Sequence, residues 1–357
     1  METILVTGAA GFIGANLVMR LLKEDKPVRV VGIDNLNDYY DPAIKHYRLD
    51  MIACTAAEQP GGEWIFRKAD IADKEYVARL FAEYRPSIVV NLAAQAGVRY
   101  SITNPDAYVE SNIIGFYNIL EACRHSYDDG AEGVRHLIYA SSSSVYGANS
   151  TVPYSTDDKV DTPVSLYAAT KRSDELMAHA YSKLYDIPAT GLRFFTVYGP
   201  AGRPDMAYFK FTDKLLKGET IEIFNYGNCK RDFTYIDDIV EGIVRVMARP
   251  PERKRGDDGL PVPPVALYNI GNGRPEGLLD FVRILCEELV DAGVLPADHN
   301  FETHKRLVAM QPGDVAVTYA DTSRLEHDFG FRPSTTLREG LRKFARWYRD
   351  FYQENIK

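Results

Sequence analysis

The sequence predicts an α/β protein with a doubly wound parallel sheet and a smaller, mixed lobe at its C-terminal end. Strand and helix patterns alternate along the first half at a spacing of about 25 residues, which is typical of right-handed βαβ units. A glycine-rich turn follows the first strand, at residues 8–14. Polar residues follow the later strands, at the edge where parallel sheets bind their ligands.

The first apolar strand, residues 4–7, breaks directly into this turn, and a helix begins at Phe12 with apolar residues at i, i+4 spacing. Gly8 lets the chain turn tightly, Gly11 lets backbone N–H groups approach a pyrophosphate, and Gly14 lets helix and strand pack closely. The positive end of the helix dipole faces the phosphates. The turn therefore predicts a Rossmann-type dinucleotide site.

A second strand, residues 28–33, ends on Asp34. At this distance from the glycine turn, an acidic residue accepts hydrogen bonds from the hydroxyls of the adenosine ribose. The residues directly after Asp34, beginning with Asn35, include no Arg or Lys. A 2′-phosphate on the ribose would meet a carboxylate, so the sequence predicts NAD rather than NADP as the cofactor.

The alternation continues to the middle of the chain. We expect helices at 43–53, 73–84 and 106–125, and strands at 64–69, 87–91 and 136–140. Contacts with NAD are expected from the glycine turn, the strand ends and the neighbouring helices: Gly8, Gly11, Phe12, Ile13, Gly14, Asp34, Asn35, Asp70, Ile71, Leu92, Ala93, Ala94, Gln95, Asn112, Ala140, Tyr167, Lys171 and Phe194.

The pattern loosens in the second half. After a helix at 165–185 and a strand at 189–195, we expect helices at 207–217, 237–248 and 277–291, strands at 220–224 and 265–270, a loop at 226–231, an exposed excursion at 249–264 and two terminal helices. We assign residues 1–190 to an NAD-binding domain and 191–357 to a substrate lobe. Segments such as 233–249 are expected to return to the first domain.

Composition excludes several classes of protein. The 357-residue chain has a formal net charge of -8 and no basic arm, which argues against a nucleic-acid partner. Glycine cuts the N-terminal apolar run within a few residues, so we expect neither a signal peptide nor a membrane span. The cysteines lack metal-ligand spacing and fit reduced thiols in a cytoplasm, and the seven histidines form no ligand pair. We expect no metal.

Tyr167 and Lys171 are four residues apart on a predicted helix, so their side chains share one face. An ammonium beside a phenol favours the phenolate, and the positive charge of bound NAD⁺ favours it further. Such a phenolate can take a proton from a sugar hydroxyl while a hydride leaves the same carbon for the nicotinamide. By itself the pair also fits an exposed polar helix face, but the nucleotide-binding pattern and the serine run at 141–144 favour catalysis.

Together these motifs resemble the extended short-chain dehydrogenase/reductase family, along essentially the whole chain. The stretches at 37–41, 96–101, 230–235 and 310–314 are most similar to the nucleotide-sugar 4-epimerases, and among them to the UDP-glucuronate 4-epimerases. The resemblance implies NAD that stays bound through turnover, oxidation of the sugar at C4, rotation of the 4-keto sugar and return of the hydride to its opposite face. It also implies homodimers that pack helices 106–125 and 166–185 as a bundle.

The resemblance assigns roles to individual residues. Ser142 would hydrogen-bond the reacting hydroxyl, Tyr167 would act as the base, and Lys171 would hold tyrosine and ribose. We expect the UDP-sugar to be bound by these residues: Arg99, Ser142, Ser143, Ser144, Thr196, Arg203, Phe224, Arg231, Gln311 and Asp314.

Four of these positions carry specific expectations. Arg231 is similar to a diphosphate contact, whereas Gln311 stands where hexose epimerases usually carry an arginine for phosphate. That departure weakens the hexose interpretation or shifts phosphate binding to Arg231 alone. For the sugar carboxylate, Arg203 is the nearest plausible cation after the sixth strand, and Arg99 is the second candidate.

Other reactions remain as alternatives. Dehydratases of this family need an Asp-Glu pair beside the catalytic hydroxyl, and the similar decarboxylases carry a glutamate where Ser144 stands. Here only hydroxyls are present, so UDP-glucuronate 4-epimerisation is the leading hypothesis. A 4-epimerase of neutral UDP-hexoses comes second and a decarboxylase third. A non-catalytic NAD-sensing module is the alternative outside enzymes, and the intact pair of Tyr167 and Lys171 argues against it.

Overall fold

The computed structural model describes residues 1–59, 61–256, 259–310 and 315–353. Its central feature is a seven-stranded parallel sheet in the order β12-β6-β5-β4-β1-β2-β3. The predicted fold class is confirmed. The strands are β1 (Glu2–Thr7), β2 (Val28–Asp34), β3 (Glu63–Lys68), β4 (Ile88–Asn91), β5 (His136–Ser142), β6 (Ala189–Phe194) and β12 (Val265–Ile270).

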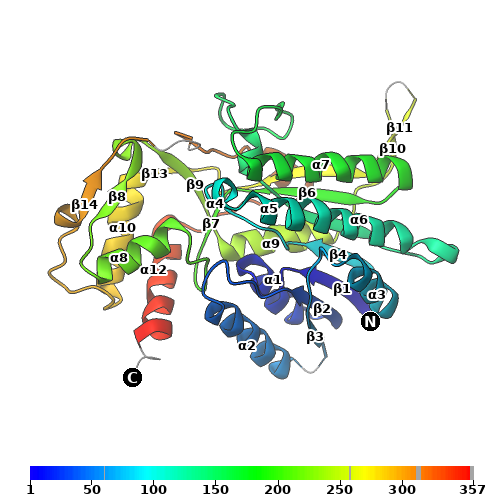
Figure 1. Cartoon of the computed structure of the whole chain (residues 1–357), viewed down its shortest axis with the longest axis horizontal. Helices are drawn as coiled ribbons and strands as arrows, with labels where there is room; N and C mark the ends of the chain where they lie inside the picture. The colour runs from blue at the N-terminus through cyan, green and yellow to red at the C-terminus, as the bar shows by residue number, and fades with distance from the viewer. Residues whose placement is uncertain (60, 257–258, 311–314, 354–357) are drawn as a thin grey trace.

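Helices cover both faces of this sheet (Figure 1). Consecutive residues of β1 point into different cores: Ile4 and Val6 pack with the helices on one face, and Leu5 packs with those on the other. This explains why residues 4–6 are all apolar, since both faces of the strand are buried there. One layer holds α1 (Phe12–Leu22), α2 (Ala43–Glu58) and α9 (Ile236–Met247), and the other holds α3 (Lys74–Tyr84), α6 (Gly115–His125) and α7 (Leu166–Tyr185).

A smaller lobe lies beside the sheet, at the left of Figure 1. It is packed around aromatic side chains: the rings of Phe233 and Phe281 stack with centroids 4.4 Å apart, and Phe209 meets Phe344 edge-on. Its elements are β7 (Thr196–Tyr198), β9 (Lys230–Tyr235) and β13 (Pro275–Gly277) in one sheet, β8 (Ile221–Ile223) and β14 (Lys305–Leu307) in another, and the helices α8 (Ala207–Leu216), α10 (Leu278–Asp291) and α12 (Leu337–Tyr348).

The structure differs from the expected elements at several points. Residues 230–231, expected in a loop, begin strand β9, which pairs with β7 and β13. The helix expected at 106–125 is divided into α5 (Pro105–Tyr108), the π-helical η1 (Val109–Ile114) and α6. Phe224, expected within a strand, instead opens the short helix η4 (Phe224–Gly227) after β8. The excursion at 249–264 contains a small exposed hairpin of β10 (Lys254–Arg255) and β11 (Pro261–Val262).

The chain crosses between the two parts more than once. The sheet takes in β6 and β12, which both extend beyond residue 190, and α9 packs against α1. The division into an NAD-binding domain and a substrate lobe stays a proposal. Across the described residues, none of the helices has the length and apolar character needed to span a bilayer. Nor do three His, Cys, Asp or Glu side chains gather there as a metal site.

Candidate active site

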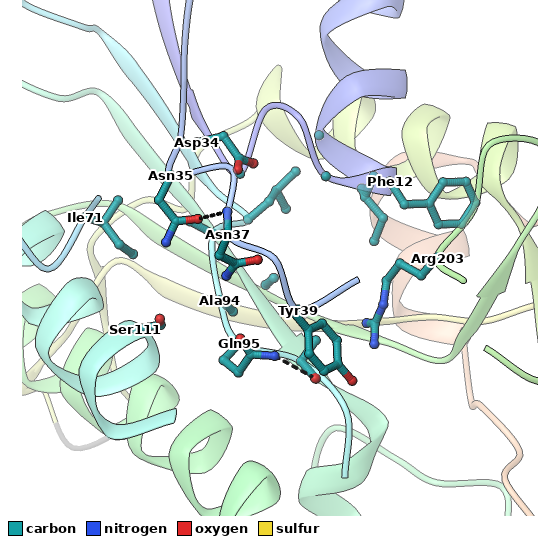
Figure 2. A pocket seen from close by; sticks show the side chains of 18 of the residues that line it. Phe12, Asp34, Asn35, Asn37, Tyr39, Ile71, Ala94, Gln95, Ser111 and Arg203 are labelled. Carbon is teal, nitrogen blue, oxygen red and sulfur yellow. Dashed lines mark hydrogen bonds between the residues drawn. The ribbon is translucent and has the colours of Figure 1, made fainter. Parts of the chain in front are cut away.

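A cleft opens at the carboxyl ends of the parallel strands. Figure 2 shows part of its lining. The structure brings these predicted residues together in it: Gly8, Gly11, Phe12, Ile13, Gly14, Asp34, Asn35, Asp70, Ile71, Leu92, Ala93, Ala94, Gln95, Ala140, Ser142, Tyr167, Lys171, Phe194 and Arg203.

The glycine turn places the N-terminus of helix α1 at the cleft. Gly8 has a φ of +68°, a left-handed conformation that favours glycine, and a Cβ at Gly14 would collide with the carbonyl of Gly8. Helix α1 begins at Phe12 with no side-chain cap and no acidic residue in its first turn. The first N–H groups of this helix therefore face the cleft with the positive end of the dipole and suit a diphosphate.

Asp34 is held at the end of β2 by the backbone. Its carboxylate accepts hydrogen bonds from Ala10 N at 3.2 Å and from Leu36 N at 2.9 Å, and it is 9% exposed. Lys45, which the sequence reasoning missed, lies 4.0 Å from this carboxylate and donates to Asn37 O and Oδ1 at 2.8 and 2.7 Å. Burial lowers the pKa of Lys45, with the pull of Asp34 opposing it. The acidic side chain and the room around it fit a ribose diol.

Two further contacts order the strand ends. Asn35 Nδ2 donates to Asp70 Oδ2 at 2.8 Å, which ties the end of β2 to the segment after β3. Asn112 does not line the cleft. Its side chain accepts from Gln95 N at 2.8 Å and donates to Thr170 Oγ1 at 2.9 Å, which anchors the segment after β4 to α7. Asn112 lies in η1, and its neighbour Ser111 reaches the cleft instead.

Tyr167 and Lys171 lie on the first turns of α7, which Ser165 caps by accepting from Ala168 N at 3.1 Å. Both side chains line the cleft. Lys171 Nζ donates to Ala140 O at 3.0 Å and to Asp174 Oδ2 at 3.1 Å. These two contacts fix the buried ammonium on the face of the helix that also carries the Tyr167 phenol.

The serine run divides between the cleft and the core. Ser142 lines the cleft, and its hydroxyl accepts from Ser144 Oγ at 2.9 Å. Ser143 and Ser144 belong to the helical turn η3 (Ser143–Tyr146) and are not among the lining residues. Ser141 also lines the cleft, but its Oγ donates to the buried Glu175 at 2.6 Å. Of the four hydroxyls, Ser142 is therefore the one placed to meet a ligand beside Tyr167.

Arg203 enters the cleft from the loop after β7, beside the Tyr39 side chain (Figure 2). Its guanidinium donates to both carboxylate oxygens of Asp205, at 3.0 and 2.6 Å, and Tyr39 donates to the same carboxylate at 3.1 Å. Burial and the neighbouring Asp205 raise the pKa of Tyr39 to about 12, so it stays a neutral donor. A partly buried cation is thus held in place at the substrate side of the cleft.

Four expected substrate contacts lie outside the lining of this cleft. The Arg99 guanidinium stacks over the Phe224 ring at 5.2 Å. Arg231 donates to Ala316 O at 3.2 Å, and Thr196 is the first residue of β7. The two remaining predictions, Gln311 and Asp314, lie outside the described residues.

Comparison with known sequences identifies the family. A sequence model described as the NAD dependent epimerase/dehydratase family matches residues 4–271. The chain belongs to this family. The predicted resemblance is thereby confirmed, and so is the assignment of the chain to an NAD-dependent group of enzymes.

Individual relatives in the epimerase/dehydratase family agree in both sequence and structure. UDP-glucuronate 4-epimerase 4 of Arabidopsis thaliana is 44% identical over 361 residues, covering 99% of this chain and 77% of the plant protein. The probable UDP-glucuronate 4-epimerase of Rhizobium meliloti (strain 1021) is 42% identical, covering 98% of this chain and 97% of the relative. The crystal structure of UDP-glucuronic acid 4-epimerase from Bacillus cereus with UDP-glucuronic acid and NAD matches with a TM-score of 0.81 at 31% identity, covering 98% of this chain and 100% of that one.

Proposed function

We propose that this chain catalyses the NAD-dependent 4-epimerisation of UDP-glucuronate to UDP-galacturonate. The observation that carries the proposal is one cleft, with the glycine turn and Asp34 at one end and Tyr167, Lys171, Ser142 and the partly buried Arg203 at the other. Relatives at 42–44% identity that are named UDP-glucuronate 4-epimerases support the same substrate.

Each side chain has a defined task in this reaction. Ser142 donates to, or accepts from, the C4 hydroxyl and orients it toward Tyr167, which takes its proton and later gives one back. Lys171 favours the deprotonated phenol through its charge. Reversible acceptance of a hydride from C4 is the chemistry that bound NAD supplies. The backbone donors of the glycine turn and the carboxylate of Asp34 hold that cofactor, with Asp34 favouring a ribose that carries no phosphate.

Arg203 is the group we assign to the sugar carboxylate. A buried carboxylate needs a cation or several donors, and Arg203 is fixed beside the cleft by Asp205. This argues against a neutral hexose as the main substrate. The buried Glu175 is no acid for a decarboxylase, because its carboxylate accepts two hydrogen bonds from Arg193, at 2.8 and 2.9 Å. Although burial opposes it, Arg193 lowers the pKa of Glu175.

We also propose a homodimer in the cytoplasm. Apolar side chains are exposed along η1 and α7: Val109 at 43%, Ile114 at 46%, Leu176 at 55% and Leu184 at 70%. Neighbouring helices that expose such residues suit burial against a second copy of the same surface. The described cysteines are all free thiols, which suits a reducing compartment.

The test is turnover of UDP-glucuronate deuterated at C4, without added reductant. We expect UDP-galacturonate with the label retained at C4, no solvent hydrogen at C5 and only traces of UDP-pentose. Oxidation at C4 creates a β-keto acid that loses CO₂ readily, so UDP-pentose as the main product would instead make the enzyme a decarboxylase. Loss of the label from C4 would contradict hydride return within one bound complex.

A further inference from the structure

Helix α7 carries a second buried charge directly behind the catalytic pair. Tyr167, Lys171 and Asp174 follow one stripe of the helix at i, i+4 and i+7. Asp174 is 2% exposed and Lys171 is 3% exposed, and their charged groups are 3.1 Å apart. Within the described part of the chain, Asp174 Oδ1 has no hydrogen-bond partner. The carboxylate therefore depends on Lys171 alone for compensation.

This arrangement is costly for the fold. Burial of a carboxylate with one ion pair and an unpartnered oxygen leaves its desolvation only partly offset. Burial raises the pKa of Asp174 to about 7, while the attraction of Lys171 opposes that rise. A neutral amide at this position would avoid the cost and still accept a hydrogen bond from Lys171, so stability does not explain the charge.

The surroundings of Asp174 contain few other charges. Glu175, the next residue of α7, is paired with Arg193 and Arg172. The buried Tyr139 phenol of β5 lies near the carboxylates of Glu175 and Asp174. Burial, together with these two negative charges, raises the pKa of Tyr139. From α6, Glu121 accepts a hydrogen bond from Tyr181 Oη at 2.7 Å, further along α7. Lys171 is thus the one described group that bonds the Asp174 carboxylate.

We propose that Asp174 is a positioning residue for the reaction, which orients the Lys171 ammonium and offsets its charge beside Tyr167. This role of Asp174 rests on the proposed function, in which Tyr167 acts as the base. Where Asp174 is ionised, its carboxylate reduces the positive potential at the phenol, so it raises the pH above which Tyr167 can accept a proton.

Asp174→Asn tests this, because the amide keeps the shape and the acceptor but removes the charge. The acid limb of the kcat/KM profile for UDP-glucuronate should move to lower pH by about 0.5 to 1 unit, since Lys171 then acts on Tyr167 uncompensated. Asp186→Asn is the matched control: Asp186 ends the same helix, and its side chain is 52% exposed. Its profile should stay in place.

A second measurement needs no turnover. The ultraviolet band of the Tyr167 phenolate is followed against pH in the NAD-loaded protein, as the difference between each Asp174 form and the same form carrying Tyr167→Phe. In Asp174→Asn this band should develop at lower pH by the same amount. Should Asp174→Asn fail to fold, Asp174→Ser removes the same charge and enters the same comparison.

A failure of the role of Asp174 can be distinguished from a failure of the proposed function. Equal pH midpoints for the phenolate band with and without the Asp174 charge would overturn the role of Asp174, whatever the enzyme converts. A shifted band in a protein that does not epimerise UDP-glucuronate would support the role of Asp174 while refuting the proposed function.

Discussion

Replacing Gly8 by alanine tests how closely the dinucleotide turn must fit its neighbours. At its φ of +68° an L side chain costs about 1–2 kcal/mol. The new Cβ would also lie 2.8 Å from Ala93 N and 2.9 Å from the carbonyl carbon of Leu92, both backbone atoms that cannot rotate away. Overpacking of this kind costs about 1–3 kcal/mol. Together the two effects predict a loss of about 2–5 kcal/mol in the free energy of unfolding.

The same clash should expel the cofactor. Relief of the overlap pushes the segment after β4 away from the turn, and both line the cleft. We therefore expect purified Gly8→Ala to carry little NAD, measured in the denatured extract, and to gain less stability from added NAD than the parent. Urea unfolding with and without NAD supplies the free energies.

Gly218→Ala is a matched control. Gly218 has the same φ of +68°, but a Cβ there would meet nothing within 4 Å. The free energy of unfolding of this variant should fall only by the cost of the left-handed backbone, about 1–2 kcal/mol. The variant should keep its NAD. If Gly8→Ala were no less stable than Gly218→Ala and held NAD equally well, the packing argument for the turn would be refuted.

Three further outcomes are expected. Tyr167→Phe should lower kcat by several orders of magnitude while UDP-glucuronate still binds, as measured by calorimetry; near-normal turnover would remove Tyr167 from the mechanism. Arg203→Ala should weaken kcat/KM for UDP-glucuronate more than for UDP-glucose, and equal losses would mean that Arg203 does not recognise the acid. Burial lowers the pKa of His136 to about 4, so protons bind the unfolded chain more readily than the folded one. The free energy of unfolding should therefore fall by up to about 3 kcal/mol as the pH is lowered from 6.5 toward 4. His136→Gln, compared by urea unfolding over that range, should lack this loss.

The features that could be predicted best are those set by the succession of neighbouring elements along the chain. Strand, glycine turn and helix follow one another within a few residues, so Gly8, Asp34 and Tyr167 could be located from spacing alone. Side chains that reach the cleft from longer loops and from α2 could not, because their positions depend on tertiary packing. Tyr39 and Lys45 are of this kind. Lys45 could have been predicted because it is a basic residue on the helix that follows the strand ending at Asp34.

Strand β9 escaped prediction because its centre is charged. Asp232 reads as a loop residue, yet it is fully buried and its carboxylate accepts hydrogen bonds from the backbone of Asn272, Gly273 and Ala320 at 2.7, 3.0 and 3.0 Å. These donors replace water around the carboxylate. The π-helical turn η1 was equally hidden, since one extra residue in a turn hardly alters an apolar pattern averaged over twenty positions.

The return of β12 to the sheet governs when the central sheet can be completed on the ribosome. Strand β6 is complete at Phe194, but the strand that pairs with its outer edge ends only at Ile270, 76 residues later. At about 5–20 residues per second, that edge stays open for about 4–15 s of synthesis. A bare, apolar strand edge pairs readily with other chains. We therefore expect nascent chains that end between β6 and β12 to depend on holdase chaperones. Slower synthesis between these two strands should favour aggregation.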